Sequence, residues 1–292
     1  MKKNYSSETG LIIRSCNIKQ DKREAQNISY LYFLNWFVGF TDGDGCFNIY
    51  IDNKNNKVIF TFKISQNNKN IQALYYIKKN LKHGIVSKID SYGMVHYLIR
   101  RQDHLNNIIC TLFQYIPLRT IKNHDFLLFK QCLSIYMDSS KSQHDKILEI
   151  KKLKENPCPT TTFLVVELNK AWLAGFIEAD GSFYITKKEE GRLSHGFGIT
   201  QKHDKHILYQ IKNLFLIDSK VKLNKGGNSL KPFWSLDATG YKSLKRIKDY
   251  FFKSFKGNTS LYYRIWSRSF KHKGKYEKLL IVQRQLKKLR KN

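Results

Sequence analysis

The sequence predicts an α+β protein made of two similar units, each with the element order α-β-β-α-β-β-α. Two observations lead to this fold class. The phrase GFTDGDGCF at 39–47 returns as GFIEADGSF at 175–183, and the residues that follow each copy match in a nearly constant register. In both copies an apolar helix precedes segments in which apolar and polar residues alternate. This order is typical of an antiparallel sheet that helices cover on one face only.

The repeat continues well beyond the two phrases. Asp44 matches Asp180 at an offset of 136 residues, and Gln66 matches Gln201 at an offset of 135. Because only two copies exist and each is long, a solenoid is excluded and two similar domains are predicted. A third set of matches, at an offset of 137, pairs Leu118, Phe126 and Phe129 with Phe255, Tyr263 and Trp266.

Each unit is expected to open with an apolar helix, at 30–40 in the first unit and at 168–177 in the second. A hairpin follows in the first unit, because residues 47–54 and 58–66 alternate with a period of two. The same alternation leaves one apolar and one polar face on the hairpin. The later elements are a helix near 207–215, strand pairs near 84–100 and 220–237, and a helix at 104–116.

Shifts in composition set the predicted domain boundaries. The N-terminal stretch is polar, the segment between the units is charged and ends near two prolines, and the chain closes with a run rich in Lys and Arg. We therefore predict a disordered arm at 1–29, a first domain at 30–137, a linker at 138–165 with room for a short helix, a second domain at 166–280, and a basic, solvated tail at 281–292.

The charge of the chain points to a polyanionic partner. Lys and Arg number 52 against 23 Asp and Glu, a formal net charge of +29. Self-repulsion of this size disfavours a compact monomer unless a polyanion offsets it, and nucleic acid is the first candidate. An acidic membrane surface is the alternative. The sequence has no lipidation motif and no run of eighteen apolar residues, so no membrane association is predicted.

The five cysteines give little sign of a structural site. Their number is odd, and no CxxC pair is present. A structural zinc site and a disulfide framework are therefore disfavoured, and a reducing compartment is expected.

Small residues lie four apart in both opening helices. Gly39 and Gly43 form the pair in the first helix, and Gly175 and Ala179 form the pair in the second. Residues of this size let two helix backbones approach closely. We therefore expect the two helices to pack on each other with their C-terminal ends side by side.

An aspartate stands at the end of each of these helices. We expect Gly45 and Gly181 to adopt the left-handed conformation that closes a helix, with Asp44 and Asp180 together at the base of a cleft between the units. A helix C-terminus carries partial negative charge, so two carboxylates there are unfavourable. A divalent cation relieves this repulsion, and Mg²⁺ prefers carboxylate, carbonyl and water oxygens. Such a metal beside a polyanion can activate water for displacement at a phosphodiester.

A structural interpretation competes with the metal site, because a single DGDG phrase is usually a turn. Two copies, each after a helix with spaced small residues and before an alternating strand, favour the functional interpretation. The first acid of each phrase, Asp42 or Glu178, is expected to be structural, through hydrogen bonding or solubility at the helix end.

The two phrases resemble the LAGLIDADG motif, at 37–45 (FVGFTDGDG) and at 173–181 (LAGFIEADG). The chain is similar to the monomeric, two-motif LAGLIDADG homing endonucleases over residues 30–275. The resemblance implies two αββαββα units related by a pseudo-twofold axis, with saddle-shaped antiparallel sheets in the major groove of a long double-stranded DNA target. It also implies an intron-encoded, Mg²⁺-dependent enzyme that cuts both strands and is encoded in a mitochondrion or chloroplast.

The resemblance assigns the metal site to the ends of the two motif helices. Asp44 and Asp180 would bind Mg²⁺, and the backbone carbonyls of Gly43 and Ala179 would join them. Ca²⁺ could occupy the same site without supporting cleavage.

The resemblance also assigns residues that act on water and phosphate. Gln66 and Gln201, each at the end of a second strand, would order metal-bound and nucleophilic waters, and Lys122 would polarise water or stabilise charge on the phosphate. Without the resemblance, the glutamines could equally cap strands and the lysine could be an ordinary surface residue. Thr259 stands opposite Lys122 in the second unit, and Lys205 could partly replace the missing lysine. We therefore expect unequal strand rates, which a time course on supercoiled DNA without a nicked intermediate would contradict.

The polar faces of the strands are the expected DNA-reading surface, because amide, hydroxyl and cationic groups suit base edges and phosphates. Each residue could also be an ordinary solvated strand position. The candidates in the first unit are Asn48, Tyr50, Asp52, Lys54, Thr61, Lys63, Ser65 and Arg100, and those in the second are Tyr184, Thr186, Lys188, Gly198, Thr200, Lys205, Lys222 and Asn224.

Two other function classes fit the same basic fold. One is a splicing cofactor that binds host intron RNA, and the other is a DNA-binding regulator built on an inactive nuclease. Retention of both Asp44 and Asp180 favours cleavage over either alternative, without excluding a dual role with intron RNA.

Overall fold

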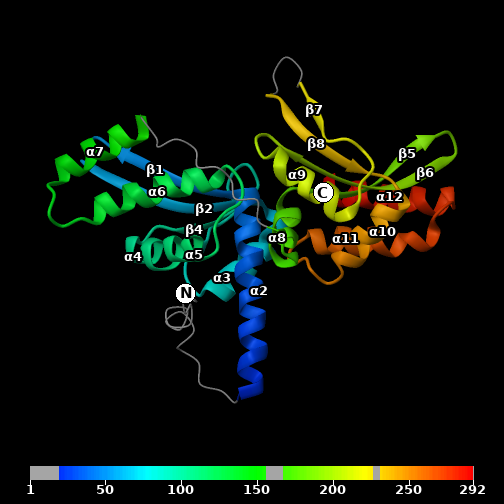
Figure 1. Cartoon of the computed structure of the whole chain (residues 1–292), viewed down its shortest axis with the longest axis horizontal. Coiled ribbons are helices and arrows are strands. Elements are labelled where there is room, and N and C mark those ends of the chain that lie inside the picture. The colour runs from blue at the N-terminus through cyan, green and yellow to red at the C-terminus, as the bar shows by residue number, and fades with distance from the viewer. Residues whose placement is uncertain (1–19, 156–166, 226–230, 292) are drawn as a thin grey trace, which may run out of the picture.

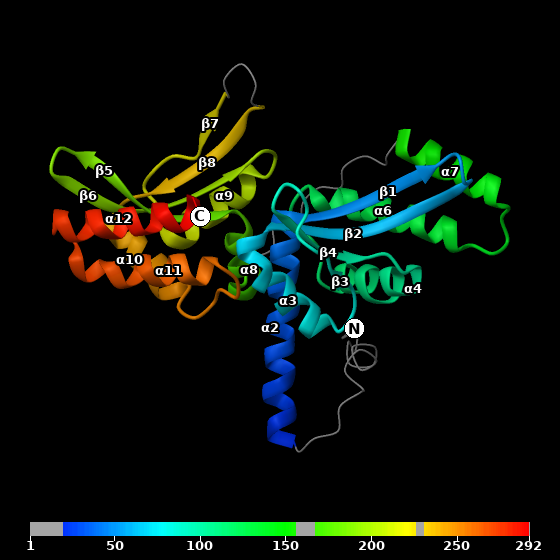
Figure 2. The ribbon, with the colours of Figure 1, turned by 180° about the vertical axis from the view of Figure 1, so that it is seen from behind.

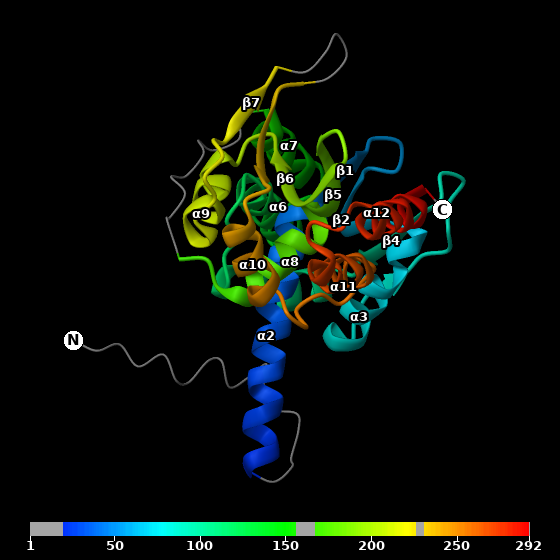
Figure 3. The same cartoon turned by 90° about the vertical axis from the view of Figure 1, so that its right-hand side faces the viewer.

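The computed structural model describes residues 20–155, 167–225 and 231–291 and has the predicted α+β architecture of two similar units (Figure 1). Two helices lie together at the centre of the molecule, and a four-stranded sheet lies on each side of them, as the view from behind also shows (Figure 2). The N-terminal part of the longer central helix projects beyond the two units, away from the sheets (Figure 3).

The first unit has the expected order of elements, followed by two more helices. The central helix α2 (Gln20–Asp44) leads directly into the hairpin of β1 (Gly45–Asp52) and β2 (Lys57–Asn67). The helix expected at 104–116 is divided, because a π-helical segment interrupts it. The remaining elements are η1 (Asn68–Asn70), α3 (Ile71–Leu81), β3 (Ile85–Val86), β4 (Met94–Ile99), α4 (Gln102–His104), η2 (Leu105–Cys110), α5 (Thr111–Tyr115), α6 (Lys122–Met137) and α7 (Gln143–Glu155).

The second unit repeats this order. The second central helix α8 (Lys170–Asp180) leads into β5 (Gly181–Glu189) and β6 (Arg192–Gln201). Helices α11 (Thr259–Arg268) and α12 (Tyr276–Lys291) pack against β5 on the side of the sheet that the core occupies. The remaining elements are α9 (Lys205–Phe215), β7 (Lys222–Asn224), β8 (Phe233–Ala238), α10 (Tyr241–Tyr250), α11 (Thr259–Arg268), η3 (Ser269–His272) and α12 (Tyr276–Lys291).

The two sheets share one topology. The strand order is β1-β2-β4-β3 in the first and β5-β6-β8-β7 in the second, and all neighbouring strands are antiparallel. Phe47 lies opposite Phe62 in the first hairpin, and Phe183 lies opposite Phe197 in the second. This equivalent register confirms the duplication that the sequence predicts.

Each sheet buries one face against its own helices. Phe60, Phe62 and Ile64 are at most 2% exposed, as the alternation along β2 predicts. In the second unit Phe183 packs against Trp266 of α11, with ring centroids 5.0 Å apart. The opposite face of each sheet is left for polar side chains.

Three predicted segment boundaries do not coincide with elements of the structure. Helix α2 begins at Gln20, so the expectation of a disordered arm over 1–29 is wrong for residues 20–29. The predicted linker contains α7, whose Ile147 and Ile150 are buried against the first unit. Helix α12 crosses the predicted boundary at 280–281, and its buried Leu286 shows that the segment is not simply a solvated tail. Residues 1–19, 156–166 and 292 lie outside the described residues.

The two central helices, α2 and α8, end differently from the prediction. Gly181 has φ −82° and ψ 152°, which is extended and not left-handed, and Gly45 likewise begins a strand without a positive φ. Glycine is required here because the backbone passes close to the preceding turn of the helix. A Cβ on Gly45 would lie 2.6 Å from the Thr41 carbonyl oxygen, and one on Gly181 would lie 2.6 Å from the Ile177 carbonyl oxygen. Each helix therefore runs straight into its first strand.

None of the helices in the described ranges is both long enough and apolar enough to cross a membrane.

Candidate active site

The two motif helices are in backbone contact through their small residues, as the spacing predicts. A Cβ on Gly39 would lie 1.9 Å from the Trp172 carbonyl oxygen, and a Cβ on Gly175 would lie 1.9 Å from the Trp36 carbonyl oxygen. One turn later, a Cβ on Gly43 would lie 2.3 Å from the Ala179 Cβ. The contact is nearly symmetric, and it holds the two helix ends side by side.

The same contact brings the second acid of each motif to the junction between the units. The ideal Cβ position of Gly43 lies 3.3 Å from Asp180 Oδ2, so the end of α2 adjoins the carboxyl group of α8. Gln66 Nε2 donates to Asp44 Oδ2 at 2.5 Å, and Gln201 Nε2 donates to Asp180 Oδ2 at 2.6 Å. Each carboxyl group is therefore oriented by the glutamine at the end of its own unit's central strand.

Burial makes this pair of carboxyl groups hard to ionise without a cation. Burial raises the pKa of Asp44, while the Gln66 hydrogen bond and the Lys122 charge oppose the shift. The pKa of Asp180 is raised to about 7, first by burial and then by the negative charge of Asp44. The repulsion between two acids at adjoining helix ends, expected from the sequence, is thus present in the structure.

The site fits a hard divalent ion that brings water with it. Among the described residues no cluster of three or more His, Cys, Asp or Glu side chains could hold a metal. Two carboxylates alone leave several ligand positions for water and phosphate oxygens. That donor set suits Mg²⁺, which binds through one or two carboxylates and substrate phosphates.

The first acid of each motif is structural, as expected. Asp42 is 2% exposed and accepts hydrogen bonds from the backbone N–H groups of Arg119 and Thr120, at 3.1 and 3.0 Å, and from Thr120 Oγ1 at 2.6 Å. Trp172 Nε1, from the helix of the other unit, donates to Asp42 Oδ2 at 2.7 Å. Asp42 thus joins the first unit's α6 turn to the second unit's motif helix.

Glu178 makes the equivalent contacts in the second unit. It is 3% exposed and accepts from Lys256 N at 2.8 Å, from Gly257 N and, at 3.1 Å, from Trp36 Nε1 of the first unit. Burial raises the pKa of Asp42 to about 6 and that of Glu178 to about 7, and in each case the donated hydrogen bonds oppose the shift. Each first acid therefore fastens the two units together and carries no free position for a metal.

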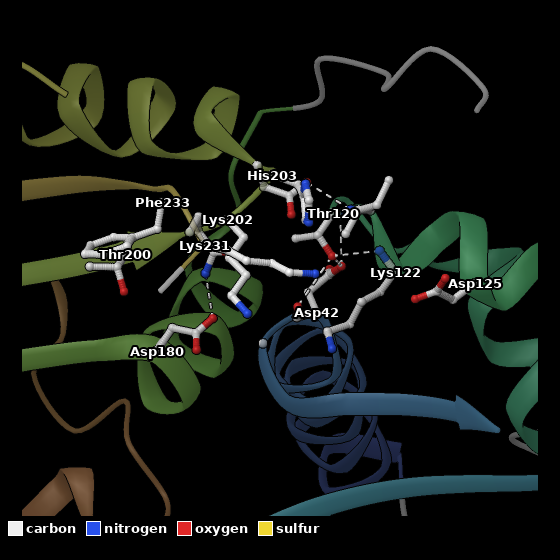
Figure 4. A pocket seen from close by; sticks show the side chains of 14 residues that line it. Asp42, Thr120, Lys122, Asp125, Asp180, Thr200, Lys202, His203, Lys231 and Phe233 are labelled. Carbon is white, nitrogen blue, oxygen red and sulfur yellow. Dashed lines mark hydrogen bonds between the residues drawn. The ribbon is translucent and has the colours of Figure 1, made fainter. Parts of the chain in front are cut away.

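A cavity of about 820 Å³ opens beside the Asp180 carboxyl group (Figure 4). Asp180 projects into it from α8, and Lys122 lies at the N-terminal end of α6 on the side of the first unit (Figure 4). Lys122 Nζ donates to Gly45 O at 2.6 Å, at the start of β1. A cation is thus held near both motif carboxylates, and its charge opposes the upward shift in the pKa of each.

Thr259 stands opposite Lys122 in the second unit, and Lys205, the proposed partial replacement, lies elsewhere. Thr259 is 9% exposed, and its Oγ1 donates to Glu178 O at 3.3 Å. Lys205 begins α9, and its ammonium group lies 5.1 Å from the centre of the Trp234 ring. The suggestion that Lys205 serves in place of Lys122 is therefore wrong on geometric grounds.

The candidate DNA-reading residues of the first unit lie mainly on the open face of its sheet. Asn48 and Tyr50 are exposed on β1, and Lys63 and Ser65 are partly exposed on β2. Lys54 and Arg100 are also exposed, in the hairpin turn and just after β4. Two candidates differ from the expectation: Thr61 is only 6% exposed, and Asp52 accepts hydrogen bonds from Asn55 that shape the hairpin turn.

In the second unit several of the candidates are already engaged with neighbours. Tyr184 Oη donates to Asp237 Oδ1 at 2.7 Å, and Gly198 is buried beneath these two side chains, so Gly198 offers no reading contact and that prediction is wrong. The others remain accessible to different degrees. Lys188 Nζ donates to Thr239 Oγ1, Asn224 Nδ2 donates to Ser235 Oγ, Thr186 is partly exposed, and Thr200 and Lys222 are exposed.

The structure adds site residues that the sequence analysis missed. Lys202, His203, Asp204 and Lys231 line the cavity beside Asp180, and three of them directly follow Gln201 in the chain. Asp204 is 3% exposed and accepts from Ile121 N at 2.9 Å, which fixes the turn that carries Lys122. Proximity to Gln201 is the signal that could have identified this segment.

Comparison with known proteins agrees with this geometry. The family profile described as LAGLIDADG endonuclease matches residues 37–133 and 173–270, one match in each unit. The chain belongs to the LAGLIDADG endonuclease family. It is 39% identical over 267 residues to the probable intron-encoded endonuclease Cox1-I1b of Schizosaccharomyces pombe, which covers 88% of this chain and 69% of that protein.

A more distant relative is an uncharacterized mitochondrial protein, RF1, of Saccharomyces cerevisiae, 29% identical over 195 residues, which cover 65% of this chain and 40% of the relative. Solved structures of LAGLIDADG proteins share the fold. The meganuclease I-CpaMI bound to uncleaved DNA has a TM-score of 0.72 at 18% identity, covering 86% of this chain and 97% of that one. The homing endonuclease I-LtrWI bound to target DNA has a TM-score of 0.71 at 23% identity, covering 87% and 96%.

Proposed function

We propose that the protein is a monomeric, site-specific homing endonuclease that cuts both strands of a long, asymmetric DNA target. The observation that carries this proposal is the convergence of Asp44 and Asp180 at the junction of the motif helices, each held by its own glutamine. Both motifs lie in one chain, so a single copy supplies the pair of carboxylates. A net charge of +29 supports a polyanionic substrate.

Mg²⁺ is the proposed cofactor, with Asp44 and Asp180 as its carboxylate ligands and the carbonyls of Gly43 and Ala179 beside them. When bound there, the ion would activate water and stabilise the leaving oxygen at the phosphodiester. Gln66 and Gln201 would orient the carboxylates and nearby water, while the ammonium group of Lys122 would stabilise negative charge on the phosphate. The structure of I-SmaMI with uncleaved DNA in the presence of calcium supports the expectation that Ca²⁺ occupies this site without cutting.

The open faces of the two sheets are the proposed DNA interface. Exposed Asn48, Tyr50, Thr200 and Lys222 offer amide, hydroxyl and ammonium groups there, as base edges and phosphates require. The relatives named for cox1 introns and for a mitochondrial protein support a mitochondrial intron as the source of the chain.

The test is a double substitution, Asp44→Asn with Asp180→Asn, on DNA sites selected from a randomised library by cutting in Mg²⁺. Cleavage should fall by at least about a thousandfold, because the carboxylate ligands are lost. DNA affinity in Ca²⁺ should stay within about threefold, since neither residue lies on the open sheet faces. Unchanged cutting by the double variant would refute the assigned site, and failure of the unaltered chain to cut any library site would refute the function.

A further inference from the structure

A second cavity lies beside the motif helices, at the position related to the first by the pseudo-twofold axis. It is smaller, about 380 Å³. Ala179, Thr259 and Gln66 line it, and these are the counterparts of Gly43, Lys122 and Gln201 in the first cavity. Each cavity therefore combines the motif end of one unit with the strand-end glutamine of the other. The second has a threonine where the first has a lysine.

Another cation reaches this second cavity from the end of the chain. Arg290, in α12, lines the cavity, and its Nη2 donates to Phe183 O at 2.7 Å and to Ser182 Oγ at 3.1 Å. These two residues stand at the start of β5. In the first unit Lys122 Nζ donates to Gly45 O at the start of β1. The guanidinium and the ammonium groups thus bind the same part of equivalent strands.

Several contacts hold the end of α12 in this position. Leu286 is 2% exposed, so the helix is packed up to its last turn. Tyr262 Oη donates to Leu289 O at 3.1 Å, and the Arg290 guanidinium lies 5.8 Å from the centre of the Tyr262 ring. Lys69 Nζ, from the first unit, donates to Arg290 O at 3.3 Å. Arg290 is therefore placed by contacts with both units.

We propose that Arg290 takes the place of Lys122 in the second cavity and binds the phosphate that is cut there. This proposal rests on the proposed endonuclease function. The two hydrogen bonds to β5 use only Nη2, and a guanidinium group carries three further N–H donors on Nε and Nη1. Its planar donor set suits a phosphate, and it keeps its charge at every relevant pH. The segment predicted to be a basic tail thus completes the site of the unit that has Thr259.

The test measures each strand separately with the full chain and a plasmid that carries a site selected from the randomised library. Arg290→Ala should slow the cutting of one strand by about 10- to 100-fold, because one phosphate donor is lost, and leave the other strand within about twofold. Nicked plasmid should accumulate. Lys122→Ala should slow the opposite strand. Arg284→Ala is the matched control, since Arg284 is exposed on the same helix and does not line the cavity.

Placing a different cation in the second cavity should restore the cutting of the affected strand. Thr259→Lys added to Arg290→Ala should speed the cutting of that strand again. The logarithm of its cleavage rate constant should recover by at least half of what Arg290→Ala removed. If Arg290→Ala does not fold, Arg290→Lys should still cut that strand and Arg290→Gln should not. The proposal is overturned if Arg290→Ala slows both strands equally or neither. Failure of the unaltered chain to cut the plasmid at all would instead refute the endonuclease function.

Discussion

The cavity on the Lys122 side and the cavity on the Thr259 side are built mostly from equivalent positions, yet they differ in size, about 820 against 380 Å³, and in the element whose cation binds the start of the neighbouring first strand. In the first cavity the cation begins a helix that follows a turn held by Asp204. In the second cavity the cation is Arg290, which comes from the last turn of α12, the final helix of the second unit. Duplication has thus kept most of the positions that line the two cavities and changed several of the side chains that stand there.

The helix junction between the cavities has changed much less. A Cβ built on Gly39 or on Gly175 would lie at the same 1.9 Å from an opposing carbonyl oxygen, and Asp42 and Glu178 each accept an indole N–H from the opposite unit. Backbone contact and buried hydrogen bonds leave little freedom for substitution, because any change must be accommodated by both units. Positions that face a cavity have no such restriction.

The largest loss of folding stability is expected for substitutions at the symmetric junction of the two motif helices. Gly39→Ala and Gly175→Ala should each destabilise the protein by about 3–5 kcal/mol, because the new methyl group overlaps a backbone carbonyl that cannot move alone. Denaturant unfolding measures the change. Gly240→Ala is the control, since its Cβ would meet only Asp218 Oδ2 at 3.5 Å. If the two variants differ by more than about 2 kcal/mol, the junction is not the symmetric contact described above.

A somewhat smaller loss of stability is expected when the first acid of either motif, Asp42 or Glu178, is replaced. Asp42→Ala should cost about 3–4 kcal/mol, because it leaves buried N–H donors of Arg119, Thr120 and Trp172 without their acceptor. Glu178→Ala should cost about 1 kcal/mol less, since Glu178 has no side-chain donor equivalent to Thr120 Oγ1. Thermal and denaturant unfolding at pH 7.5 give the comparison. A larger loss of stability for Glu178→Ala than for Asp42→Ala would show that the number of hydrogen bonds lost does not determine which variant is less stable.

Sequence reasoning identified the parts of the molecule that recur. The duplication, the period-two strands and the four-residue spacing of small residues each have one structural meaning, so the fold, the helix contact and the acid pair at its end were predictable. The left-handed conformation assigned to Gly45 and Gly181 was wrong, because glycine is needed there for close approach to the preceding turn.

The asymmetric residues were not predictable in this way. The sequence matches between the two units end at Trp266, so they do not extend to Arg290, and a basic C-terminal run usually faces solvent. Lys205 looked like a replacement for Lys122 because it is near Gln201 in the chain, but its side chain lies over Trp234. Which cavity a side chain enters depends on the packing of both units, and one unit's sequence does not contain that information.

The smallest effect at neutral pH, and one that grows with acid, is expected in the core of the second unit. His195 stands where the first unit has Phe60, and it is 5% exposed, with its Nε2 2.8 Å from Ser269 Oγ and its ring 4.1 Å from that of Phe270. Burial lowers the pKa of His195 to about 4. Between pH 4 and the ordinary histidine pKa of about 6.5 the unfolded chain therefore binds more protons than the folded one, so stability falls as the pH falls.

The loss assigned to this histidine is about 3 kcal/mol at pH 4 relative to pH 7.5. His195→Phe, which copies the first unit, should remove that part of the pH dependence while changing stability by about 1 kcal/mol or less at pH 7.5. The informative quantity is the difference between the variant and the unaltered chain in urea unfolding at both pH values, because the raised pKa values of Asp42, Glu178 and Asp180 act in both proteins and with the opposite sign. If the stability of the two proteins changes with pH in parallel, His195 takes up its proton in the folded state as readily as in the unfolded chain. The two cores would then not differ in acid stability through the lowered pKa of His195.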